Sequence, residues 1–173
     1  MTSNEDKPYG FHEQLAKGQV QEDRLDRHFS KWYDIITATK AQQREGLDRI
    51  FVDGSGREVS VEYKADFRSH LTGNAYIETV SVGKYDDDNE WQVTKEGWVY
   101  TSTADFLVYL VVETGDFYIL AMPFIKRSRL PVWERMSKYR SVTVRNNGYQ
   151  GRGLLVPLDE LRDDSIALGN IGE

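Results

Sequence analysis

The chain of 173 residues contains no cysteine, which excludes disulfide bonds, thiolate metal sites and cysteine nucleophiles. Its longest apolar run, Phe106 to Val112, is far shorter than a membrane-spanning helix. It has three histidines, widely separated in sequence (His12, His28 and His70), so a zinc site is not expected. The N-terminus lacks the basic and then apolar order of a secretion signal. We therefore expect a soluble, cytoplasmic protein without membrane contact.

The apolar content of 39% is sufficient for one folded domain of ordinary size. We expect this domain to span residues 10–168, with flexible tails at 1–9 and 169–173. The chain contains no internal repeat and no linker, and it lacks a phosphate-binding Walker loop and a dinucleotide glycine fingerprint.

Charge is unevenly distributed along the chain. The formal net charge is −6, but residues 125–152 contain eight basic residues and one acid, a net charge of +7, against −13 for the rest. A segregated basic segment matters more for attracting a polyanion than the total charge does. The segment therefore predicts contact with DNA phosphates, although a solvated basic helix and strand would look the same. The candidate DNA-binding residues are Lys126, Arg127, Arg129, Arg135, Lys138 and Arg140.

The hydrophobic pattern predicts a helix, a series of strands and a second helix. Apolar residues recur at helical spacing between residues 12 and 36. Residues 46–52 and 59–65 read as strands joined by a turn at 53–56, and 106–112 and 117–122 form a second hairpin. Further strands are expected at 76–82, 141–145 and 153–157, a partial helix at 123–138, and an edge strand within 37–45. The fold class is therefore α+β, with a mixed or antiparallel sheet and extra C-terminal strands.

The strand at residues 59–65 has one apolar and one polar face, because side chains alternate along a strand. Glu62 and Lys64 share the polar face, and the preceding strand of the hairpin places Asp48 close to them. Two carboxylates that converge on one point repel each other unless a cation lies between them. Oxygen ligands of this kind suit Mg²⁺ or Mn²⁺, and a neighbouring lysine can orient a water molecule or stabilise charge on a phosphate.

The spacing of Asp48 and Glu62-Tyr63-Lys64 resembles the Asp…(Asp/Glu)-x-Lys signature of the PD-(D/E)XK nuclease superfamily, although Leu47 replaces the proline before the aspartate. The resemblance, which covers residues 12–82, implies a restriction endonuclease-like core and Mg²⁺-dependent endonuclease activity on DNA. It assigns Asp48, Glu62 and the carbonyl of Tyr63 as metal ligands, Lys64 as the residue that positions water, and Glu22 as a supporting helix acid. Cleavage of both strands would favour a homodimer.

Two other functions remain open from the sequence. The chain could be a catalytically silent nuclease-fold module that binds DNA or a protein, which its overall acidity favours. It could also be a metal-free hydrolase with paired carboxylates, and Glu62 and Lys64 taken alone could be a surface ion pair. The roles of Glu78, Gln43 and His70 are not assigned.

Overall fold

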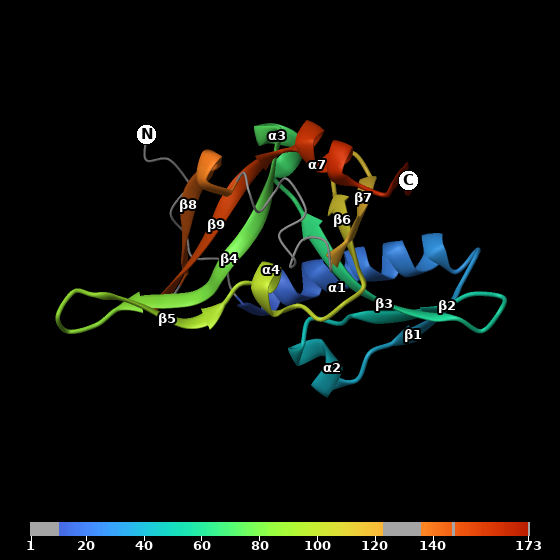
Figure 1. Ribbon diagram of the computed structural model, residues 1–173, viewed down its shortest axis with the longest axis horizontal. Helices are drawn as coiled ribbons and strands as arrows, with labels where there is room; N and C mark the ends of the chain where they lie inside the picture. Colours follow the sequence, from blue (N-terminus) through green and yellow to red (C-terminus); the bar gives the residue numbers. More distant parts are fainter. Residues whose placement is uncertain (1–10, 123–135, 147, 173) are drawn as a thin grey trace.

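The computed structural model describes residues 11–122, 136–146 and 148–172. The strands form a six-stranded sheet in the order β1–β2–β3–β6–β7–β10 and a four-stranded sheet in the order β5–β4–β9–β8 (Figure 1). The first sheet consists of β1 (Asp34–Thr37), β2 (Arg49–Val52), β3 (Glu58–Asp66), β6 (Phe106–Val111), β7 (Asp116–Ala121) and β10 (Ala167–Asn170). The second consists of β4 (Asn74–Tyr85), β5 (Trp91–Glu96), β8 (Arg140–Asn146) and β9 (Tyr149–Pro157).

Helix α1 (Phe11–Phe29) packs on one face of the first sheet (Figure 1). The other helical segments are short: α2 (Lys40–Arg44), α3 (Ser69–Thr72), α4 (Trp98–Thr101), a 3₁₀ turn at Met136–Lys138, and α7 (Leu158–Asp164). Leu25 and Phe29 of α1 lie against Phe51 of β2 and Val61 and Tyr63 of β3. This is the first apolar core, and it explains why alternate residues of β2 are buried.

The second sheet and α4 cover the opposite face of the first sheet. Leu107 and Tyr109 of β6 contribute to one buried cluster together with Ile77 of β4, Val156 of β9 and Trp98 of α4. Because Leu107 and Tyr109 alternate with Val108 and Leu110, which belong to the α1 core, β6 is buried on both faces. Polar residues of β3 that point away from α1 therefore point toward the second sheet.

The predicted α+β class with a mixed sheet is confirmed. Strands β1, β2 and β3 form an antiparallel meander, and β6 runs parallel to β3. The chain reaches β6 from β3 through α3, β4, β5 and α4, so two strands of the second sheet lie within this crossover. The expected C-terminal strands are present as β8 and β9.

The two predicted hairpins are also present, and the first has a clear local cause. Asp53 Oδ1 accepts hydrogen bonds from the backbone N–H groups of Ser55 and Arg57 at 2.8 and 3.1 Å. Gly56 has a positive φ of 80°, which other residues rarely adopt. The turn therefore fixes the register of β2 against β3, which pairs Arg49 with Val61.

The helix predicted for residues 12–36 is too long, because α1 ends at Phe29 and residues 34–37 form β1. Trp32 and Ile36, expected on the buried helix face, are 60% and 49% exposed. Pairing with β2 satisfies the backbone of this β-branched segment, so tertiary structure overrides the helical spacing. The edge strand expected within 37–45 is instead mostly α2, which Thr39 and Gln42 cap reciprocally.

Three further observations concern the ends of the predicted elements. The boundary expected at residue 168 falls inside β10, which pairs with β7 as far as Asn170. Most of the helix expected at 123–138 lies outside the described residues. No helix in the described part of the chain has the length and apolar composition needed to span a lipid bilayer.

Candidate metal and hydrolytic site

Asp48 lies immediately before β2, where the ladder between β2 and β3 ends. Its backbone N–H donates to the carbonyl of Val61 at 2.9 Å, and its Oδ2 accepts the backbone N–H of Tyr63 at 2.8 Å. The Asp48 side chain thus accepts the hydrogen bond of the Tyr63 N–H, in place of a backbone carbonyl of β2. This contact fixes the half-buried Asp48 carboxylate beside the centre of β3.

The carbonyl of Tyr63 points toward the same place. In an antiparallel ladder the N–H and C=O of one residue face the same neighbouring strand. Since the Tyr63 N–H is directed at Asp48, the Tyr63 carbonyl also faces the end of β2. The geometry therefore brings a carboxylate and a backbone oxygen to one edge.

Glu62 is the most deeply buried acid of the site, with 2% of its side chain exposed. Its Oε1 lies 2.6 Å from Lys64 Nζ, and its Oε2 has no hydrogen-bond partner. Val61 and Tyr63 belong to the α1 core, so alternation directs Glu62 and Lys64 toward the second sheet. A buried, unpartnered carboxylate oxygen is costly unless something binds it.

Lys64 is one-third exposed and lies near the Glu62 carboxylate and an aromatic ring. Its Nζ is 5.8 Å from the centre of the Trp98 ring on α4. Burial lowers the pKa of Lys64, the carboxylates of Glu62, Asp48 and Glu78 raise it, and the net shift is upward. Lys64 therefore carries a positive charge at neutral pH.

Burial raises the pKa of Glu62 above its usual value of 4.5, and Asp48 adds to this shift, while Lys64 opposes it. These effects show that Asp48, Glu62 and Lys64 form one electrostatic cluster. The sequence prediction that these three side chains meet is thus consistent with the geometry, while their roles stay predictions.

Glu22 of α1 forms an ion pair with a buried arginine of β2, and its supporting role stays a prediction. Its Oε2 lies 3.0 Å from Nη2 of Arg49, which is 3% exposed and also binds Asp26 through Nε at 2.9 Å. Arg49 and Tyr63 face α1, so Glu22 lies on the side of β3 opposite to Glu62. Burial and the nearby Asp48 carboxylate raise the pKa of Glu22. The carboxylate of Glu22, the predicted helix acid, is therefore paired with the Arg49 guanidinium.

Sequence reasoning missed the pairing of Arg49 with Asp26. Asp26 follows Glu22 by four residues on α1, so the two acids share one helix face. Arg49 lies between Asp48 and Ile50 in β2, and alternation places it on the α1 side. The sequence spacing predicts the face on which each residue lies. It does not predict that the two acids of α1 pair with Arg49, which is distant along the chain.

The donor set fits Mg²⁺ better than a metal that needs many protein ligands. Within residues 11–122, 136–146 and 148–172, no three acidic or histidine side chains lie close enough together to hold one ion. Mg²⁺ is commonly held by one or two carboxylates and completes its shell with water and phosphate oxygens. Asp48 and Glu62 are carboxylates of the kind that such an ion uses, and their assignment as ligands, with the Tyr63 carbonyl, stays a prediction.

The remaining predicted residues are dispersed. Lys126, Arg127, Arg129 and Arg135 lie outside the described residues, whereas Lys138 is exposed in the 3₁₀ turn and Arg140 at the start of β8. The Gln43 side chain donates to the Ala38 carbonyl at 3.2 Å, and His70 is exposed in α3. Glu78 in β4 is half-buried and close enough to Lys64 to raise its pKa.

Comparison with known proteins gives little sequence similarity. No protein-family model matches the chain, and no curated protein matches it. Among solved structures, the bacterial homing endonuclease I-Ssp6803I is similar, with a TM-score of 0.46 and 20% sequence identity. The match covers 72% of this chain and 93% of that chain.

Proposed function

We propose that this protein is a Mg²⁺-dependent DNA endonuclease that hydrolyses phosphodiester bonds at the Asp48, Glu62 and Lys64 cluster, with Mn²⁺ as an alternative ion. The observation that carries the proposal is the Glu62 carboxylate. It is 2% exposed, and one of its oxygens is unpartnered beside a second carboxylate and a lysine. Such an arrangement lowers the stability of the fold. Costly groups of this kind are typical of binding and catalytic sites.

Each residue has a role that follows from its chemistry. Asp48, Glu62 and the Tyr63 carbonyl would hold the ion, which when bound polarises a phosphate and lowers the pKa of water. Lys64, held by Glu62, would orient the attacking water and stabilise negative charge on the phosphate. The water oxygen forms a bond to phosphorus and releases a proton to solvent, a P–O ester bond breaks, and the leaving oxygen takes a proton from solvent.

Glu22 supports the site indirectly in this proposal. It holds Arg49, whose Nη1 donates to the Asp48 carbonyl at 2.9 Å, so the pair restrains the backbone of Asp48. The predicted basic residues would contact phosphates away from the scissile bond, which makes the affinity sensitive to salt. Cleavage of both strands would favour a homodimer.

The test is cleavage of supercoiled plasmid and of branched DNA in Mg²⁺ or Mn²⁺. Asp48→Asn is a suitable variant because its amide oxygen can still accept the Tyr63 N–H, and Lys64→Met retains the apolar stem. We expect each to lower the cleavage rate about a hundredfold or more, as for removal of one charge-stabilising group. Asp163→Asn and Lys31→Met alter exposed residues remote from the cluster and serve as matched controls.

Metal-dependent cutting that both active-site variants retain would contradict the proposed residues. A wild-type protein that binds DNA but cuts none in either ion would identify a silent binding module instead.

A further inference from the structure

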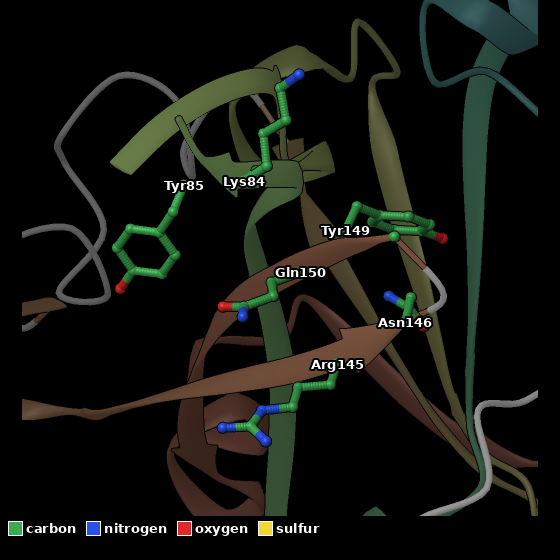
Figure 2. A pocket seen from close by; sticks show the side chains of 8 residues that line it. Lys84, Tyr85, Arg145, Asn146, Tyr149 and Gln150 are labelled. Carbon is green, nitrogen blue, oxygen red and sulfur yellow. The ribbon is translucent and has the colours of Figure 1, made fainter. Parts of the chain in front are cut away.

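A second polar site lies where β4, β8 and β9 come together. It is a pocket of about 300 Å³, lined by residues of all three strands. In Figure 2, Tyr85, Gln150 and Arg145 lie one below another on one side of the strands, and Tyr149 and Asn146 lie on the other side. None of its lining residues carries a negative charge; the charged ones are Lys84 and Arg145.

The strand register places Gln150 and Arg145 on the face of the second sheet that packs against the first sheet. Arg145 pairs directly with Gln150, and Gln150 precedes Arg152 by two residues, so the three share a face. Further along β9 the same face carries Leu154 and Val156, which are buried against the first sheet. The face that covers the Glu62 side of the first sheet therefore continues outward and becomes basic.

Arg152 is held in place by aromatic residues of the neighbouring hairpin. Its guanidinium carbon lies 3.6 Å from the centre of the Trp91 ring, and its Nη2 donates to the Tyr85 hydroxyl at 3.4 Å. The Trp91 ring in turn packs on Gly83, where a Cβ would lie 2.2 Å from Trp91 Cζ2. Trp91 is thus held between a glycine and a guanidinium, and the glycine lies opposite Gln150 in the strand register.

The polar side chains of the pocket, of which Arg145 is exposed and Gln150 half-buried, suit contact with base edges. Arginine pairs with guanine O6 and N7, and glutamine or asparagine pairs with adenine N6 and N7. β-Strands can read base edges in the major groove, and β8 and β9 are the antiparallel pair at one edge of the four-stranded sheet. In the described part of the chain, no carboxylate lies within ion-pair distance of Arg145.

The acidic turn between β4 and β5 limits how DNA can approach. Asp87, Asp88 and Glu90 are exposed there, and Asp86 accepts the backbone N–H groups of residues 88 and 90. This turn lies at the far end of the β4–β5 hairpin (Figure 1). Its charge repels phosphates and it directly follows Tyr85 of the pocket, so it disfavours approach of a duplex across the β4–β5 hairpin.

We infer that the β8–β9 ribbon enters the major groove of duplex DNA and that Arg145 and Gln150 read base edges there. This inference rests on the proposed function, because it makes the ribbon the specificity element of the same nuclease. It differs from the prediction for residues 126–140, which concerns phosphates and carries no sequence information.

The experiment is selection of bound duplexes from a library with a randomised central segment, in Ca²⁺ to prevent cleavage, followed by sequencing. Wild-type protein should enrich a sequence motif. Arg145→Ala should lose a guanine preference and Gln150→Ala an adenine preference at one position each, with affinity for the motif reduced about tenfold. Arg162→Ala, which removes an exposed arginine of α7 paired with Asp159, is the matched control and should keep the motif.

The outcomes separate this inference from the proposed function. Absence of a motif, a motif that both ribbon variants retain, or preferential enrichment from single-stranded or RNA libraries would overturn the ribbon inference and leave the nuclease proposal standing. A motif that depends on Arg145 and Gln150, in a protein that cuts its own motif in neither Mg²⁺ nor Mn²⁺, would support the ribbon and overturn the nuclease. Unchanged melting temperatures of the variants show that the exposed substitutions leave the fold intact.

Discussion

Nζ of Lys64 lies 2.6 Å from Oε1 of Glu62, while Oε2 of the same carboxylate lacks a hydrogen-bond partner. The lysine therefore pairs with one oxygen of a buried carboxylate and leaves the other oxygen without a partner. Burial of this kind lowers stability, so several measurements on the purified protein can examine it without a DNA substrate.

Divalent cations should stabilise the folded protein through Asp48 and Glu62. A ligand at ten times its dissociation constant adds about 1.4 kcal/mol to the free energy of unfolding, which raises the melting temperature by about 4 °C in a chain of this size. We expect this shift with Mg²⁺, Mn²⁺ or Ca²⁺ in differential scanning fluorimetry, and its loss in Asp48→Asn and Glu62→Gln. A full shift in both variants would place the ion elsewhere.

Replacement of Glu62 by glutamine should stabilise the metal-free protein at neutral and alkaline pH. The pKa of Glu62 is raised in the folded state, so the folded state binds more protons than the unfolded state above about pH 4.5. The contribution of Glu62 to the free energy of unfolding therefore falls as the pH rises through its folded-state pKa. Urea denaturation of both proteins from pH 4.5 to 8 should show an advantage of Glu62→Gln that grows with pH; an advantage that shrinks with pH would contradict the sign.

Lys64→Met should have the opposite effect on stability. Without the lysine, the ionised Glu62 carboxylate is buried with no compensating charge. We expect a loss of about 2 kcal/mol at pH 8, less than for a fully buried pair because Lys64 is partly solvated. The loss should diminish as pH falls and Glu62 becomes protonated. Urea unfolding at pH 8 and pH 5 provides the comparison, and an equal loss at both values would indicate lost packing instead.

Arg49→Met should destabilise the attachment of α1 to the sheet. Arg49 is 3% exposed and is the shared partner of Glu22 and Asp26, so its removal leaves two unpaired carboxylates beside Tyr63. Loss of one member of a buried ion pair costs about 3 kcal/mol. Chemical denaturation measures this cost, and Arg57→Met, in the exposed turn between β2 and β3, is the control that should leave stability unchanged.

Asp66→Asn should weaken the end of β3. Asp66 accepts the Tyr109 hydroxyl through Oδ2 and the backbone N–H groups of Arg68 and Ser69 through Oδ1, at 2.7 and 2.8 Å. An asparagine can retain only one of these acceptor oxygens, so the buried Tyr109 hydroxyl loses its acceptor. The expected cost is about 1–2 kcal/mol in urea denaturation, and an unchanged midpoint would show that another acceptor replaces it.

Part of the site was predictable because it depends on short-range rules. Alternation along β3 alone places Glu62 and Lys64 on one face. The turn at Asp53 to Gly56 sets the hairpin register, and that register brings Asp48 next to Glu62. The spacing of apolar residues, which is also a short-range pattern, predicted the α+β class.

Contacts between residues close along the chain thus account for the hairpin and for the polar face that Glu62 and Lys64 share. The tertiary structure decided the end of α1 at Phe29, the capture of Glu22 by Arg49 and the placement of Trp98 over Lys64. These depend on which distant segments pack together. Strand pairing and burial across the whole domain determine that packing, and local propensity does not encode it.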